Sequence, residues 1–351
     1  MSKRPGKYLP FLPVLAAYSV LFIYGRMVPG KWQLVAMLAF FGALGQAFNL
    51  FMGMTGYVDF GYVAFLGIGT YGMAIAIWKF SHLQGMGPWV IALGLAMAAG
   101  MATLLSLAVG AVALRLRGAY FAIATIGVNE GFRYLIEGAK LWNGSEGIIF
   151  SGQMNQMFGR EAASAISTFW ADVMVFAIAI LSAFVTLVYM RNRVGYALTA
   201  LREDEDAAKV MGIYVTKYKI IAFITSAVFA GLLGACAWAL QLTYVFPPDV
   251  FEIHYTIEAI IIVMLGGAGT LLGPVFGGLI YGGAKYWLAI LFSGQYPVTI
   301  PLVGWSFILP SISPLLLFAP IILIIIVAFP EGTVGVLKRK TRGTTLEKWI
   351  V

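Results

Sequence analysis

Long apolar runs separated by short polar segments make up most of the chain. A helix needs about 20 apolar residues to cross the hydrocarbon core of a bilayer. By that length the pattern predicts ten spans, at residues 9–28, 32–52, 54–78, 88–114, 119–137, 168–190, 218–242, 256–272, 274–293 and 307–329. We therefore expect an all-α membrane protein whose residues 1–351 form a single transmembrane domain.

One long polar segment, residues 191–217, has hydrophobic runs on both sides. Good helix formers fill the stretch between Gly195 and Gly212. A glycine on each side predicts a short helix with a start and a stop at the membrane surface. Within this stretch Arg202 and four consecutive acids, from Glu203 to Asp206, precede the small residues Ala207 and Ala208, and we expect another protein to act on the segment. The alternative is an ordinary cytoplasmic loop of mixed charge.

The composition fits a polytopic membrane protein. The chain of 351 residues is 61% hydrophobic and 11% charged, whereas soluble domains are about 25% charged. The net charge of +8 would suggest nucleic acid as a partner of a soluble protein. In a membrane protein it reports basic loops that orient the chain, so we expect a lipid bilayer and no nucleic acid.

The distribution of lysine and arginine predicts the orientation. With ten spans and a cytoplasmic start, 16 of the 23 basic residues fall inside and 6 outside, while Lys285 lies within a span. This bias favours two cytoplasmic termini. Residues 138–167 then form the longest external loop, which is too short for a separate domain. External recognition would need a shallow surface or a partner protein.

Two glycine-dense stretches occupy the middle of each half of the chain. One runs from Gly53 to Gly72 and the other from Gly266 to Gly283. Their starts align, which suggests two pseudo-repeated halves with broken helices near a substrate path. The other interpretation is close helix packing through small residues. The candidate residues are Gly53, Gly56, Asp59, Gly61, Gly266, Gly267 and Gly269.

Ionisable residues within predicted spans are expected to have a structural or functional role, because inserting a charged side chain at the bilayer centre costs roughly 2.5–3.5 kcal/mol. Glu130 and Arg133 are three residues apart on one helical face and can pair. Glu258 lies near the start of the eighth span. These residues either hold helices together or line the path.

Motifs of catalysis are absent from the sequence. It contains no GxxxxGK[ST] phosphate loop, no HExxH and no GxSxG elbow. We therefore expect no enzyme activity, no metal and no cofactor in this chain. Energy for uphill transport would have to come from a partner through a cytoplasmic contact at residues 191–217.

Several stretches together resemble the LivM-type permease subunit of branched-chain amino acid ABC importers. They are LRLRGAYFAIATIGVNEGFR (114–133), NRVGYALTALREDEDAAKVMGI (192–213), KYKIIAFITSAVFAGLLGA (217–235), IEAIIIVMLGGAGTLLGPVFGG (257–278) and FPEGTVGVLKRK (329–340).

The resemblance implies a set of partners. These are a second homologous permease, two cytoplasmic ATPase subunits that carry ATP and Mg, and a periplasmic or lipid-anchored substrate-binding protein. It also implies a bacterial or archaeal cytoplasmic membrane. Coupling to the ATPase subunits would pass through the helix between Gly195 and Gly212, with Arg202, Glu203, Asp204 and Glu205 as contacts. Branched-chain or other hydrophobic amino acids are the leading cargo.

Two departures from the family pattern keep other cargo open. They are Val58-Asp59-Phe60-Gly61-Tyr62 after the first glycine turn, and Asn143-Gly144-Ser145-Glu146-Gly147 in the external loop. Urea, a short amide or a small organic acid is the alternative within this class. An ion-coupled secondary transporter is the alternative from another class, and it would need functional carboxylates at mid-membrane.

Overall fold

The computed structural model describes residues 9–83, 85–291, 297–300, 305–308 and 332–340. Its first half consists of η1 (Leu9–Phe11), α1 (Leu12–Met27), α2 (Trp32–Phe48), η2 (Asn49–Gly53), α3 (Val63–Phe80), α4 (Gly87–Ala113), α5 (Ala119–Gly138), η3 (Leu141–Glu146), β1 (Ile148–Ile149), α6 (Ser151–Phe158), α7 (Arg160–Ala165) and η4 (Ile166–Trp170).

The second half begins with α8 (Ala171–Arg191), which continues α7 and η4. Then follow α9 (Arg193–Glu203), α10 (Glu205–Val210), α11 (Val215–Leu233), η5 (Gly234–Leu240), β2 (Tyr244–Val245), α12 (Pro247–Val250), α13 (His254–Gly266), α14 (Gly273–Leu291), β3 (Pro297–Ile300), β4 (Trp305–Ile308) and α16 (Gly332–Lys340). The segments η2, η4 and η5 are π-helical.

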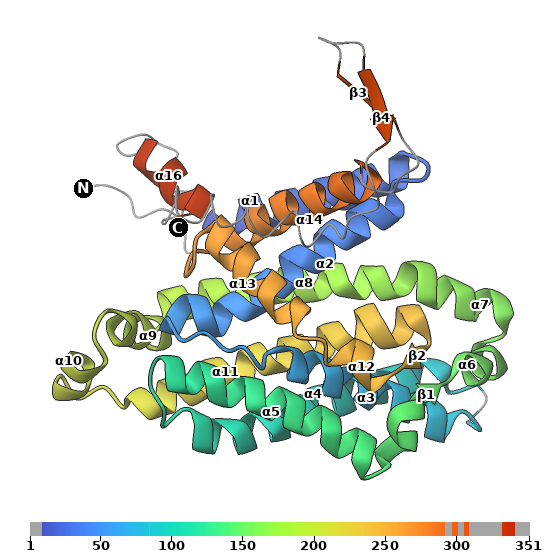
Figure 1. Ribbon diagram of the computed structural model, residues 1–351, viewed down its shortest axis with the longest axis horizontal. Helices are drawn as coiled ribbons and strands as arrows, with labels where there is room; N and C mark the ends of the chain where they lie inside the picture. The colour runs from blue at the N-terminus through green and yellow to red at the C-terminus, as the bar shows by residue number, and fades with distance from the viewer. Residues whose placement is uncertain (1–8, 84, 292–296, 301–304, 309–331, 341–351) are drawn as a thin grey trace.

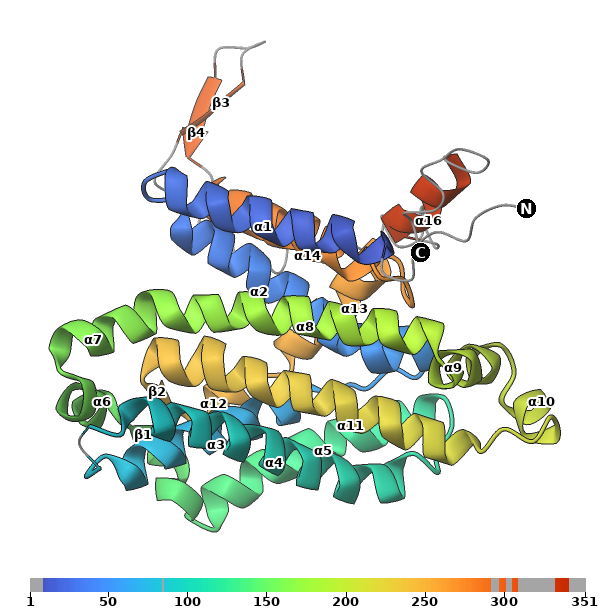
Figure 2. The same ribbon diagram turned by 180° about the vertical axis from the view of Figure 1, so that it is seen from behind.

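The long helices lie in two groups (Figures 1 and 2). One group holds α3, α4, α5, α8 and α11, and α1, α2 and α14 lie together on one side of it. Helices α9 and α10 project at one end of the molecule, and α6, α7, β1 and β2 lie at the other. The buried core runs through α2, α3, α11 and η5.

Small residues let the central helices approach closely. A Cβ atom on Gly72 of α3 would lie 2.7 Å from the Cα of Ala98 in α4, and one on Gly69 would overlap the Gly231 backbone of α11. Such contacts are typical of membrane helix interfaces, where close backbone packing replaces the hydrophobic effect.

Six helical segments in the described part of the chain are long and apolar enough to cross a membrane. They are Leu9–Met27, Trp32–Gly53, Val63–Phe80, Gly87–Ala113, Arg160–Arg191 and Val215–Leu240. The protein is therefore an all-α membrane protein that crosses the bilayer several times. All six overlap predicted spans.

The other four predicted spans do not correspond to any of these six segments. The span predicted at 119–137 is α5, a helix of 20 residues, and the one at 274–293 corresponds to α14. The span predicted at 256–272 contains the 13-residue α13, which ends at Gly266. Most of 307–329 lies outside the described residues.

The segment predicted as an external loop, residues 138–167, is mostly helical. It contains η3, α6 and α7, and its β1 pairs antiparallel with β2 through Ile148–Val245 and Ile149–Tyr244. This short ladder joins the 138–167 segment to the residues that follow η5.

Candidate functional site

The predicted helix between Gly195 and Gly212 consists of two helices, α9 and α10, which we call the knob (residues 193–212). The expected start at Gly195 is wrong, because α9 begins at Arg193 and Gly195 lies against the Tyr189 carbonyl. The stop is as expected. Gly212 follows α10 with φ +84°, a left-handed conformation that suits glycine.

Asp204 separates the two helices of the knob. Its backbone is extended, with φ −155° and ψ 113°, and its side chain accepts hydrogen bonds from the amides of Asp206 and Ala207, both at 2.9 Å. An aspartate that caps a helix in this way satisfies amides that have no partner within the helix. Asp204 therefore shapes the knob, and Glu203 beside it remains exposed.

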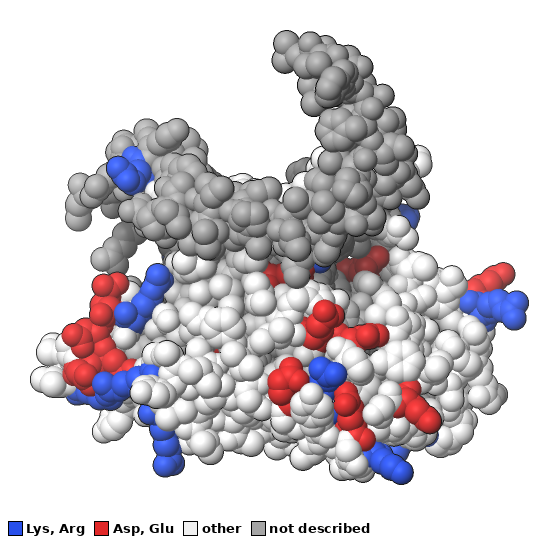
Figure 3. Space-filling view, in the orientation of Figure 1, with Lys and Arg blue, Asp and Glu red and all other residues white. Residues whose placement is uncertain are grey.

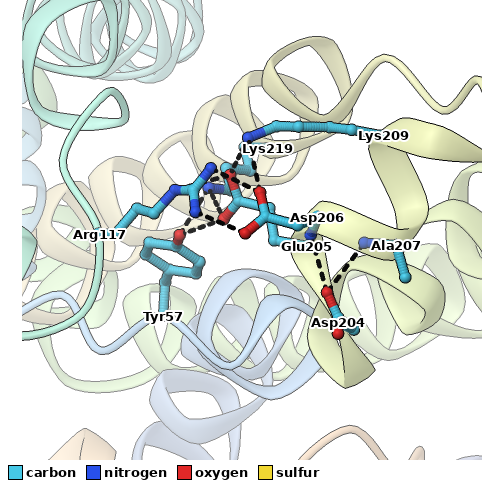
Figure 4. A network of polar contacts seen from close by, with 8 residues as sticks. All are labelled: Tyr57, Arg117, Asp204, Glu205, Asp206, Ala207, Lys209 and Lys219. Atoms are coloured by element: carbon cyan, nitrogen blue, oxygen red, sulfur yellow. Dashed lines mark hydrogen bonds and ion pairs between the residues drawn. The ribbon is translucent and has the colours of Figure 1, made fainter.

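Glu205 points back toward the bundle and does not extend into solvent (Figure 4). The Nζ atom of Lys219, at the start of α11, lies 2.7 Å from Glu205 Oε2 and 2.7 Å from the Tyr57 hydroxyl. Tyr57 donates its own hydroxyl hydrogen bond to Glu205. The Lys219 side chain is only 2% exposed, so this ion pair anchors α10 to α11 and to the segment after η2.

A second contact joins the knob to the turn between α4 and α5. The Arg117 guanidinium makes two hydrogen bonds to Asp206, of 2.9 and 3.0 Å. Both side chains are more than half exposed, and exposed pairs contribute little to stability. This contact orients α10, whereas the buried Lys219–Glu205 pair holds it in place.

The outer surface of the knob combines charge with apolar side chains. Val210 is 87% exposed and Met211 82% exposed, and Tyr196 and Tyr214 lie nearby in the sequence with most of their surface in solvent. Ala207 is exposed and Ala208 is buried. Charged side chains gather over α9 and α10 in Figure 3. Contiguous exposed apolar patches mark interaction sites, and Val210 and Met211 are neighbouring exposed apolar side chains at the end of α10. The polar pattern of residues 191–217 did not single out these two residues.

The two glycine turns lie in contact with each other beside the knob. The Asn49 side chain bridges them, because its Oδ1 accepts from the Gly269 amide at 2.8 Å and its Nδ2 donates to the Thr270 carbonyl at 3.0 Å. A Cβ on Gly53 would lie 2.6 Å from the Gly269 nitrogen. Gly56 and Gly269 share φ +76°. Each glycine turn thus lies between two helices, and the two turns touch.

Arg202 of α9 connects both turns to the knob. Its guanidinium donates hydrogen bonds to the carbonyls of Gly53, at 2.7 Å, and Ala268, at 3.3 Å. Gly53 ends η2, and Ala268 comes just after α13. The carboxyl end of a helix carries about half a negative elementary charge, so a cation there is stabilising. One side chain thus caps the ends of two helices from different halves of the chain.

The remaining glycines of the second turn contact α16. Thr333 donates a hydrogen bond to the Gly266 carbonyl at 3.2 Å, and Gly332 lies against Gly267. The described C-terminal helix therefore packs at the same end as the knob.

The segment after the first glycine turn runs into the bundle without helical structure. Asp59 is buried, and its Oδ1 accepts from the Gly61 amide at 2.9 Å. The Phe60 amide donates to Thr125 Oγ1 of α5 at 3.1 Å, and Gly61 lies directly against the Thr125 carbonyl. A cavity of about 560 Å³ lies between this segment, the start of α5 and the knob, with Arg202 and Glu205 in its wall.

The ionisable residues of the predicted spans do not lie together. Arg133 pairs with Glu130 at 3.7 Å as expected, but its closer partner is Glu137 at 3.1 Å, and all three side chains are partly exposed on α5. Glu258 is fully buried and pairs with Lys285 at 2.6 Å. No group of three or more metal-ligating side chains occurs among the residues that the structure describes.

Fold and site together define a polytopic helical membrane protein with a charged helical knob connected to two interrupted helices. The profile of the family described as "Branched-chain amino acid transport system / permease component" matches residues 30–325. The chain belongs to this family.

Individual relatives agree with the family match. The chain is 30% identical to the high-affinity branched-chain amino acid transport system permease protein LivM of Salmonella typhimurium, over 69% of this chain and 59% of the relative. It is 28% identical to LivM of Escherichia coli, over 72% of this chain and 62% of the relative. The chain thus spans about three-fifths of the length of these relatives. No solved structure matches it.

The contact between the glycine turns predicts a specific sensitivity at Gly269. In Gly269→Leu the side chain would displace the Arg202 guanidinium and crowd the Gly53 carbonyl, 2.7 Å from the added Cβ. We expect a lower melting temperature in detergent and loss of transport. Gly30→Leu is the matched control, because Gly30 has the same φ of +76° with no atom within 4 Å of its Cβ position. Equal effects of both substitutions would show that backbone strain alone matters at Gly269.

The Glu205 cluster predicts a dependence of stability on pH. Partial burial raises the pKa of Glu205, but hydrogen bonds from Lys219, Tyr57 and Lys209 outweigh it and lower the pKa from 4.5 to about 2. A carboxyl whose pKa is lowered by folding stabilises the folded state fully at any pH above its pKa in the unfolded chain. This stabilisation is lost as the pH falls through the pKa in the folded state.

We therefore expect Glu205→Gln to have a lower melting temperature than the wild type. The difference should be constant above pH 4.5, the ordinary pKa of a glutamate, and should shrink as the pH falls toward about 2. Melting curves of both proteins in detergent across this range measure it. A difference that does not change with pH would contradict an ionised, paired Glu205.

Proposed function

We propose that the chain is a membrane-spanning permease subunit of an ATP-driven ABC importer for branched-chain or other hydrophobic amino acids. The observation that carries the proposal is the family match over residues 30–325. The knob supports it, because its outer face is exposed to solvent and its inner face contacts both glycine turns. The permease forms half of the path, and ATP hydrolysis takes place on separate subunits.

The proposed topology has ten spans, two pseudo-repeated halves and both termini in the cytoplasm of a bacterial or archaeal cell. The excess of lysine and arginine on the predicted inner side supports it. The contacts of the knob with Arg117 and of the second glycine turn with α16 support it as well, since they gather three predicted cytoplasmic segments at one end.

The proposed coupling route starts at Val210 and Met211, where an ATPase subunit docks. Motion of α10 passes through Glu205 to Lys219 of α11, and motion of α9 passes through Arg202 to the two glycine turns. Coupling through a contiguous set of contacts between rigid helices is physically reasonable. Rigid-body rocking of two permeases would then expose the path to each face in turn.

The proposed partners are a second homologous permease, two ATPase subunits and a periplasmic or lipid-anchored substrate-binding protein. The relatives are named as branched-chain amino acid permeases, and we extend that cargo to this chain.

The docking surface can be tested with Val210→Asp combined with Met211→Asp. Both side chains are exposed, so folding should be unaffected, while a carboxylate at an apolar contact has to be desolvated without a partner. We expect the purified wild type to bring a second permease and two ATPase subunits with it, as identified by mass spectrometry. The double variant should no longer co-purify with the ATPase subunits. Its uptake rate should fall at least ten-fold, which corresponds to a loss of about 1.4 kcal/mol of binding free energy.

Ile149→Asp is the control, because Ile149 is a similarly exposed apolar residue in β1 at the opposite end. It should co-purify with all partners. A wild-type chain that transports in liposomes alone and without ATP would contradict the proposal, and so would a double variant that retains its ATPase subunits and full uptake.

A further inference from the structure

A second cavity, of about 580 Å³, lies at the end of α2 and α8 remote from the knob. Its volume falls within the range of roughly 300–1,000 Å³ that is usual for small-molecule sites. Residues from α2, η4, α8, η5, α13 and α14 line it, among them Asp172, Trp238, Gln241, Tyr255 and Lys285. The coupling route does not use these residues.

Asp172 is a carboxylate that lacks a cation. It is only 6% exposed, and its two oxygens accept hydrogen bonds from neutral donors, Trp32 Nε1 at 2.7 Å and Gln241 Nε2 at 2.6 Å. No lysine, arginine or histidine forms an ion pair with it among the residues that the structure describes. A buried carboxylate without a counter-ion is costly, so a cationic group of a ligand would be stabilised here.

Lys285 contributes the opposite charge to the same cavity. Its Nζ lies 2.6 Å from Glu258 Oε1, and one third of its side chain remains exposed. An ammonium group has three donor hydrogens. Lys285 can therefore keep its bond to Glu258 and still donate to the carboxylate of a ligand.

Aromatic and aliphatic side chains line the cavity between these polar groups. Trp238 packs against Tyr255 with their ring centres 4.7 Å apart, and Met37 and Phe40 of α2 are further lining residues. An apolar wall with a few placed polar groups is the usual composition of a binding site for a small amphipathic molecule.

The backbone around the cavity is irregular in a way that is frequent at functional sites. Two of the three π-helical segments in the described residues, η4 and η5, contribute to its wall through Thr168 and Trp238. Single π-helical turns inside α-helices occur often where ligands bind. The Thr168 carbonyl also accepts a hydrogen bond from Trp32 Nε1 at 3.2 Å, so η4 and Asp172 share one donor.

We infer that this cavity binds a zwitterionic α-amino acid with an apolar side chain. The ammonium group lies at Asp172, the carboxylate at Lys285, and the side chain against Trp238. The inference rests on the proposed function, which makes such an amino acid the cargo, and it adds a binding site within the permease itself. Asp172 lies in the first turn of α8, which continues to Arg191 next to the knob, so one helix connects the site to the coupling surface.

The test is equilibrium binding of radiolabelled leucine to the full-length chain, purified with its partner subunits and free of the binding protein. Leucine should bind saturably. Its analogues 4-methylpentanoate, which lacks the ammonium group, and 3-methylbutylamine, which lacks the carboxylate, should compete at least ten-fold more weakly than unlabelled leucine.

Substitutions separate the two charges. Asp172→Asn has nearly the same shape and should weaken leucine binding at least ten-fold while leaving competition by 4-methylpentanoate unchanged. Lys285→Arg retains the charge and should still bind leucine. Glu252→Gln changes an exposed acid outside the cavity and should bind as the wild type does.

Two results would overturn the inference. One is the absence of saturable leucine binding in a complex that takes up leucine with ATP. The other is leucine binding that Asp172→Asn leaves unchanged. Failure of ATP-driven uptake by the complete importer would instead overturn the proposed function, so the two failures can be told apart.

Discussion

The bridge made by Arg202 is the contact on which the organisation of this end of the molecule depends. Two glycine turns interrupt helices in different halves of the chain, and each interruption leaves backbone carbonyls without helical partners. Arg202 donates to the Gly53 and Ala268 carbonyls, and Asn49 satisfies the Gly269 amide and the Thr270 carbonyl. A backbone polar group that is buried without a partner is costly, so such carbonyls need donors. A side chain of the knob is therefore part of the structural support of the membrane helices.

This arrangement connects the surface of the knob to the interior by short steps. Glu205 is held by Lys219 and Tyr57, and Tyr57 belongs to the non-helical segment that reaches Thr125 of α5. A displacement of α10 would thus act on α11 and on this segment together. The exposed Arg117–Asp206 pair adds orientation but little free energy. The partly buried Lys219–Glu205 pair and the Arg202 bridge are the contacts that hold the knob against the bundle.

Much of this could be predicted from the sequence. The apolar runs indicated a polytopic helical protein, and the glycine-dense stretches indicated interrupted helices. The quoted motifs indicated the family, which the profile match confirms. The predictions failed where tertiary contacts decide. Asp204 breaks the knob because its side chain caps α10, and Glu205 turns inward because Lys219, fourteen residues later, is buried beside it. The end of α13 at Gly266 coincides with the start of the second glycine-dense stretch, although the predicted span ran on to residue 272.

We propose that Arg202 transmits motion from the knob to both glycine turns. This transmission is tested most directly by the number of ATP molecules hydrolysed per amino acid transported, measured in liposomes with the complete importer. We predict that Arg202→Ala retains ATP hydrolysis stimulated by the binding protein but raises this ratio at least about ten-fold, while Arg202→Lys, which keeps one charged donor, raises it less. An unchanged ratio in Arg202→Ala, with normal assembly, would contradict the account.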